Sequence, residues 1–276
     1  MQNDGNVGLA MLTPSSNTVV EPLTSAMAWP LYPDVSVHFG RFRVTRIALD
    51  EGSNSQFTLE PILAAADLLA DAKPAIIAWN GTSASWLGFD TDDRLCAAIT
   101  KRTGIPATSA ILSLNRLLAE MGVKRLGLVT PYTRDVQQRI IANYAAIGIE
   151  TVAERHSGRS DNHSFAEVTE EEIREMCLDV AQARPDAIAI VCTNMRGPLI
   201  APELERQTGI PILDSVAFTL WGCLRETGVP MDRLAGYGQM FVSGAIKDCA
   251  PSRPNDHIED IGRNGRAIDH DTTSRK

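Results

Sequence analysis

The chain has 276 residues, 44% of them hydrophobic, which is enough to bury a sizeable core in one or two domains. The formal net charge of −8 is not offset by any basic stripe or Lys/Arg cluster, which argues against a nucleic-acid partner and against an anionic membrane surface. The N-terminus is polar and the longest apolar runs are the length of strands, so we expect neither a signal peptide nor a membrane-spanning helix.

Short apolar runs bounded by turn residues alternate along the chain with longer runs of helical periodicity. The predicted strands are Val7–Leu12, Val35–Val44, Ala75–Trp79, Leu126–Val129, Ala187–Val191 and Ile210–Leu213. The predicted helices are Leu59–Ala72, Asp92–Thr103, Ile111–Met121, Asp135–Ile147, Thr169–Ala183 and Ser215–Thr227, and glycines at 104, 122, 209 and 228 are expected to end helices. This alternation is typical of right-handed βαβ crossovers, so the sequence predicts an α/β fold of parallel sheets flanked by helices.

The sequence contains an internal repeat. Val7–Thr18 resembles Leu126–Asp135, and Ala75–Ser85 resembles Ala187–Gly197, in the same order. We therefore predict two pseudo-symmetric lobes with the active site in the cleft between them. The first predicted lobe comprises residues 1–115 and 215–248, the second comprises residues 116–214, and residues 249–276 form a polar tail. The tail is expected to be mobile or to lie on a neighbouring subunit of a homo-oligomer.

Hydroxyl-rich loops follow the carboxyl ends of several predicted strands. These loops are Thr13–Thr18, Gly81–Ser83, Thr130–Thr133 and Cys192–Asn194. Ligands of open α/β sheets bind at this edge, where hydroxyl and backbone N–H groups just before a helix can hold an anion. Helix capping explains any single loop equally well. Four such loops from two lobes favour a carboxylate site, and the expected partner is a small carboxylic acid.

The two halves of the repeat differ in one place that affects chemistry. The second half has Cys192-Thr193-Asn194 where the first half has Gly81-Thr82-Ser83. One side of the cleft therefore carries a thiol and the other only a hydrogen atom, so we expect one-sided chemistry. A cysteine introduced at position 81 is expected to lie across the substrate from Cys192 and to add racemisation.

The other cysteines and the histidines point to no further chemistry. The five cysteines show no paired spacing, which is typical of reduced thiols and of a cytoplasmic protein. Cys96, Cys177 and Cys223 fall within predicted helices as small buried hydrophobic side chains, and Cys249 belongs to the tail. No histidine pair has metal-ligand spacing and no nucleotide-binding signature occurs, so we expect neither a metal nor a cofactor.

In order and spacing, the loop motifs resemble those of the cofactor-independent aspartate/glutamate racemase superfamily. The resemblance covers residues 6–241 and includes Leu31–Asp34 near the start and Gly236–Phe241 near the end. The chain is most similar to the branch that holds arylmalonate decarboxylase and maleate cis–trans isomerase. Racemases and isomerases of the superfamily carry a cysteine in both lobes. This chain resembles the decarboxylase, with Gly-Thr-Ser in the first lobe and one cysteine in the second.

The resemblance implies a role for each motif residue. Thr82, Ser83 and Tyr132 would bind a substrate carboxylate, together with backbone N–H groups near Cys192 and Thr193. Cys192 would protonate the enediolate that remains after loss of carbon dioxide. Gly81 and Cys192 are the two catalytic positions. Asn17 matches an isomerase asparagine, and Asn162 is a looser candidate for the pocket. The residues expected to bind the carboxylate are Pro14, Asn17, Thr82, Ser83, Tyr132, Thr193 and Asn194.

Two features depart from the decarboxylase pattern. Thr193 and Asn194 follow the cysteine, as in the isomerases, where the decarboxylase has glycines. Arg41 and Arg43 alternate on a predicted strand and share a face, so they either grip a second carboxylate in the pocket or lie solvated outside it. The leading hypothesis is decarboxylation of a small malonate-type acid. An isomerase or racemase with one cysteine, and an inactive carboxylate-binding protein, stay open as alternatives.

Overall fold

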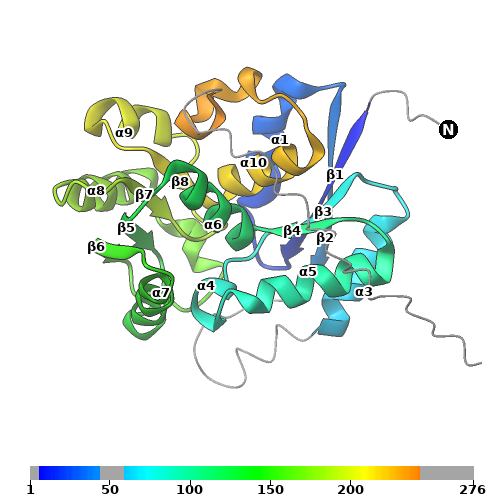
Figure 1. Ribbon diagram of the computed structural model, residues 1–276, viewed down its shortest axis with the longest axis horizontal. Coiled ribbons are helices and arrows are strands. Elements are labelled where there is room, and N and C mark those ends of the chain that lie inside the picture. The colour runs from blue at the N-terminus through cyan, green and yellow to red at the C-terminus, as the bar shows by residue number, and fades with distance from the viewer. Residues whose placement is uncertain (1–5, 44–58, 243–276) are drawn as a thin grey trace, which may run out of the picture.

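The protein is described by a computed structural model that covers residues 6–43 and 59–242 (Figure 1). It contains two four-stranded parallel sheets with the strand orders β2-β1-β3-β4 and β6-β5-β7-β8, flanked by helices. The two orders are the same when β5, β6, β7 and β8 are matched to β1, β2, β3 and β4. The predicted α/β fold with two pseudo-symmetric lobes is therefore confirmed.

The strands and helices follow one another in the same order in both lobes, except that the first lobe has an additional short helix, Ala84–Leu87, after its third strand. The first sheet consists of β1 (Val7–Pro14), β2 (Val35–Phe42), β3 (Ile76–Trp79) and β4 (Ala107–Ser109), and the second of β5 (Arg125–Thr130), β6 (Glu150–His156), β7 (Ala187–Ile190) and β8 (Ile212–Asp214). The helices are α1 (Val20–Ala28), α3 (Leu59–Ala70), α4 (Ala84–Leu87), α5 (Asp90–Thr103), α6 (Ala110–Met121), α7 (Arg134–Ala146), α8 (Glu170–Ala181), α9 (Ala201–Thr208) and α10 (Ser215–Thr227), with short 3-10 turns at Trp29–Leu31, Ser164–Glu167, Asp232–Tyr237 and Gln239–Phe241.

The strand registers of the two sheets are equivalent. Trp79, the last residue of β3, pairs with Leu12 of β1, and Ile190, the last residue of β7, pairs with Val129 of β5. All four residues of β3 and of β7 are buried, as expected for central strands covered on both faces. Trp79 and Ile190 therefore occupy equivalent places in the two lobes.

Some elements lie outside the sequence predictions. The strand β6 is partly exposed and contains charged residues, so its apolar content is too low to mark a strand. The helices α1 and α9 are short, and β4 has only three residues. The end of the predicted strand Val35–Val44 and the tail 249–276 lie outside the described residues.

The equivalent helices α6 and α10 pack against each other between the two sheets (Figure 1). Ser109 and Asp214 cap their N-termini through side-chain oxygens, and Gly122 and Gly228 end them in the left-handed conformation. The glycines that end α5 and α9 adopt the same conformation, as predicted. Because α10 contacts strands of both sheets, the division into residues 1–115 with 215–248 and 116–214 stays a prediction.

The close approach of α6 and α10 depends on Gly222. A Cβ atom at this position would lie 2.0 Å from Oγ and 2.6 Å from Cβ of Ser113. We expect Gly222→Ala to lower the free energy of unfolding by about 1–2 kcal/mol, because overpacking outweighs the roughly 1 kcal/mol gain in helix propensity. Denaturant unfolding measures this change. In a Ser113→Gly background the same substitution should be neutral or stabilising, and an equal loss in both backgrounds would contradict the steric explanation.

Candidate active site

A cavity lies at the carboxyl ends of the strands, between the two lobes. It encloses about 300 Å³ of space, its open mouth included, and is lined by Pro14, Trp79, Gly81, Thr82, Ser83, Trp86, Tyr132, Asn162, Cys192 and Thr193. The structure thus brings together residues from loops far apart in the sequence, as the repeat predicts. Trp79 and Trp86 are lining residues that the sequence reasoning missed. The only feature of the sequence that could have identified them is their position close to the Gly81–Ser83 motif, Trp79 before it and Trp86 after it.

Cys192 follows β7 and is the thiol that lines the cavity. The residue is only 3% exposed, and burial raises the pKa of the thiol to about 12. The backbone N–H of Asn194, 3.4 Å from Sγ, and the Tyr132 hydroxyl favour the thiolate, whereas the nearby Asp214 carboxylate opposes it. Burial outweighs the two hydrogen bonds, so the group is a thiol at neutral pH and can act as a proton donor.

Tyr132 connects the thiol to the first lobe. Its hydroxyl is 2.6 Å from Oγ1 of Thr82, and its ring lies edge-on between Trp86 and Phe165 at centroid distances of 5.1 and 5.4 Å. Burial, and repulsion from a Cys192 thiolate once one forms, raise the pKa of Tyr132 well above its usual value. The phenol therefore keeps its proton and offers a fixed hydrogen-bond donor to an anion.

Hydrogen bonds between loops of the two lobes form the floor of the site. The Asn17 amide donates to Oγ1 of Thr193 at 3.2 Å, and the Thr193 hydroxyl donates to the backbone carbonyl of Asn80 at 2.9 Å. The backbone N–H of Thr18 donates to Oδ1 of Asn194 at 3.0 Å. These bonds join the loops after β1 and β3 to the loop after β7.

Asn162 extends the same contacts to a third loop. Its amide donates to the Ser16 hydroxyl at 2.7 Å, and its backbone carbonyl accepts from the Asn194 amide at 2.6 Å. Asn162 and Thr193 line the cavity, whereas Asn17 and Asn194 lie behind the lining. The side-chain oxygen Oδ1 of Asn17 accepts the backbone N–H groups of residues 19 and 20. The amides of Asn17 and Asn194 thus bind protein groups in this structure.

Arg41 and Arg43 are both exposed, and neither lines the cavity. The Arg41 guanidinium forms an ion pair with Glu21 at 2.9 Å and donates to the backbone carbonyls of Ser15 and Asn17, also at 2.9 Å. Arg41 therefore supports the loop after β1 from outside the site. Strand alternation predicted that the two arginines share one face, but β2 ends at Phe42, so Arg43 lies beyond the strand.

The other described cysteines and the possible metal-ligating side chains lie outside the cavity lining. Within residues 6–43 and 59–242, no group of three or more His, Cys, Asp or Glu residues is arranged to hold a metal ion. Cys96, Cys177 and Cys223 are buried, as predicted, and burial raises the pKa of each. Over the same residues, no helix has the length and apolar character needed to cross a membrane.

Comparisons with known sequences match nearly the whole described chain. The family model described as arylmalonate decarboxylase matches residues 9–241. Arylmalonate decarboxylase of Bordetella bronchiseptica is 27% identical over 244 residues, which cover 87% of this chain and 99% of that protein. Maleate isomerase of Alcaligenes faecalis is 24% identical over 237 residues, which cover 80% of this chain and 91% of that protein.

Solved structures of both kinds of enzyme have the same fold. A cysteine-to-serine variant of Nocardia farcinica maleate cis–trans isomerase, with a covalently bound succinylcysteine intermediate, aligns with a TM-score of 0.78 and 21% identity, covering 86% of this chain and 98% of that chain. A liganded arylmalonate decarboxylase variant with one glycine-to-cysteine and one cysteine-to-serine change aligns with a TM-score of 0.74 and 24% identity over 86% and 98%. At these identities the likeness establishes the fold.

The burial of Cys192 predicts an unusual pH dependence for its alkylation. Iodoacetamide reacts with the thiolate, so the rate at Cys192 should still be rising with pH at about pH 10, where an ordinary thiol has reached its plateau. Mass spectrometry of the alkylated peptide gives the rate for this residue alone. A plateau near pH 9 would show that burial does not raise the pKa of this thiol.

The contacts of Arg41 predict an effect that is independent of ligand charge. Arg41→Ala removes support from the loop after β1, so the Kd of a dicarboxylate and that of a monocarboxylate should both rise about fivefold, for a loss of about 1 kcal/mol. Calorimetry measures both constants, with Arg43→Ala as the matched control. A loss confined to the dicarboxylate would place the Arg41 guanidinium on the ligand.

Proposed function

The chain belongs to the arylmalonate decarboxylase family, and on that premise we propose that it is a cofactor-independent decarboxylase of a small malonate-type acid, with Cys192 as the proton donor. The family relatives are enzymes named as decarboxylase or isomerase. The observation that carries the proposal is the single protonated thiol in the cavity, with no second thiol on the opposite wall.

The polar lining residues support binding of the carboxylate that the product keeps. The hydroxyl-bearing residues Thr82, Ser83 and Tyr132 line the cavity, and the bond between Thr82 and Tyr132 fixes two of the hydroxyls in place. When the carbon–carbon bond breaks, its electron pair passes into this carboxylate and forms an enediolate. Donors that are already oriented toward the developing charge stabilise it more than the ground state.

The apolar lining residues support loss of the other carboxylate. Pro14, Trp79 and Trp86 offer no charge to it, and the lining residues, all of which are described, include no Lys, Arg or His. A carboxylate that loses its hydration without gaining a cation is destabilised, whereas carbon dioxide is neutral and is not. The exposed positions of Arg41 and Arg43 agree with this reading.

Proton transfer from Cys192 completes the reaction. The thiol proton moves to the enediolate carbon, a much stronger base than a thiolate, so a thiol pKa of about 12 still permits the transfer. The thiolate that remains accepts the backbone N–H of Asn194, while the single proton of the Tyr132 hydroxyl stays directed to the carboxylate. Solvent then returns a proton to sulfur, which balances the proton delivered to carbon.

A one-cysteine isomerase or racemase is the second candidate. Thr193 and Asn194 after the cysteine favour it, because they match the isomerase pattern. Incubating the protein with substituted malonates, maleate and chiral 2-substituted acids in deuterated water, followed by NMR, separates the candidates. Release of carbon dioxide with one deuterium on carbon supports the decarboxylase. Fumarate from maleate supports the isomerase, and binding without turnover supports the inactive protein.

Replacement of the thiol tests the proton donor. Cys192→Ser should lower kcat by about 10²–10⁴-fold and leave the Kd of a product-like monocarboxylate within about threefold, because a hydroxyl is a much poorer acid. Steady-state kinetics and calorimetry give the two numbers. Cys96→Ala, a change at another buried thiol, serves as the control and should keep kcat. Near-normal turnover by Cys192→Ser would exclude this role.

A further inference from the structure

The indole of Trp79 fills the side of the cavity that lacks a thiol. A Cβ atom at Gly81 would lie 1.8 Å from Cζ2 and 2.1 Å from Cε2 of this ring. Trp79 is 1% exposed, and its ring packs against Phe42 at a centroid distance of 5.0 Å. In a close-packed interior, any side chain at position 81 requires the indole to move. The expected place for a cysteine at position 81 is thus already occupied.

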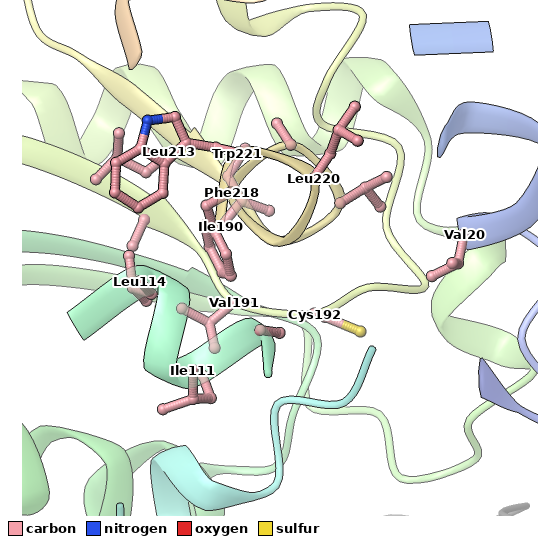
Figure 2. Packing of buried hydrophobic residues seen from close by; sticks show 14 of the residues in the cluster. Val20, Ile111, Leu114, Ile190, Val191, Cys192, Leu213, Phe218, Leu220 and Trp221 are labelled. Carbon is pink, nitrogen blue, oxygen red and sulfur yellow. The ribbon is translucent and has the colours of Figure 1, made fainter. Parts of the chain in front are cut away.

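The second lobe shows the equivalent place without an indole. Ile190 holds the register of Trp79, and two residues later Cys192 carries the side chain that Gly81 lacks. Figure 2 shows Ile190 among buried apolar residues, with the Cys192 sulfur directed away from them. Ile190 and Cys192 therefore coexist, whereas Trp79 and a side chain at 81 compete for one volume.

We propose that Trp79 determines the specificity of this site in two ways. It takes the volume of a second acid–base group, so proton transfer is confined to the face of the substrate that meets Cys192. It also limits the 2-substituent of the acid to a small apolar group. The wall of Trp79, Trp86 and Pro14 is apolar, and only about 20 Å³ of the cavity is open to the centre of a water molecule, which is room for little more than one water.

The claim about proton transfer rests on the proposed function, but the competition between Trp79 and a side chain at position 81 does not. Thermal unfolding tests this competition without any substrate. Gly81→Cys should lower Tm by about 5 °C or more, or prevent folding. Trp79→Ile alone should also lower Tm because it leaves a cavity. Combining the two changes copies the Ile190–Cys192 pair, so adding Trp79→Ile to Gly81→Cys should raise Tm.

The decisive outcome is that Trp79→Ile lowers Tm in the wild-type protein but raises it in the Gly81→Cys protein. Wild-type Tm for Gly81→Cys, or a double variant less stable than both single variants, would overturn the competition. With a chiral 2-substituted monocarboxylate in deuterated water, only the Trp79→Ile/Gly81→Cys protein should exchange the α-hydrogen and racemise the acid. Exchange by Gly81→Cys alone, or a folded double variant without exchange, would overturn the claim that the indole blocks a second acid–base group.

Ligand binding tests the limit on substituent size. Calorimetry with acetates that carry a methyl or a phenyl 2-substituent gives a ratio of Kd values for each protein. Trp79→Phe should shift this ratio toward the phenyl acid by about tenfold. Trp221→Phe, at another fully buried tryptophan away from the cavity lining, should leave the ratio unchanged. An unchanged ratio in Trp79→Phe, or equal wild-type affinity for both acids, would overturn the size limit, and neither outcome depends on decarboxylation.

Discussion

The buried hydrogen bonds between the two lobes are the constraint on which the site depends. Asn17, Thr193 and Asn194 are nearly inaccessible to solvent, and each exchanges a hydrogen bond with the opposite half of the chain or with a neighbouring loop. A buried amide that loses its partner costs more than the bond itself contributes. The lobes therefore have one favourable register, and the cavity walls that they provide separately are held at fixed distances.

Within this symmetric frame, the chemistry is asymmetric because equivalent places carry different side chains. Trp79 and Ile190 hold equivalent register positions in the two lobes, and Gly81 and Cys192 each follow two residues later. The summed side-chain volume of the two pairs is similar. The first lobe combines the large Trp79 with Gly81, which has no side chain, and the second combines the medium-sized Ile190 with the small Cys192. Packing density is thus maintained in both lobes while only one of them keeps an acid.

Most of the fold and part of the candidate site could be predicted from the sequence. Continuous apolar runs marked β1, β3, β5 and β7, because central strands of parallel sheets are buried on both faces. The edge strand β6 has no such run. Repeat position identified Cys192 and Thr82 as neighbours in space. It could not say that Arg41 turns outward, because strand periodicity fixes a shared face without fixing its direction. Nor could it find Trp79, whose role arises from a side-chain volume shared with a residue two positions away.

The packing of α6 against α10 has a consequence for how such a chain can be divided. The two helices are equivalent in the repeat, and each covers the other between the sheets. A chain cut after α6 would leave one half with an uncovered apolar helix and half of a cleft. Two copies of that half could cover each other about a true twofold axis. In such a homodimer both equivalent loops would carry the same residue, whereas in the single chain they are separate stretches of sequence, so that one has Gly81 and the other has Cys192.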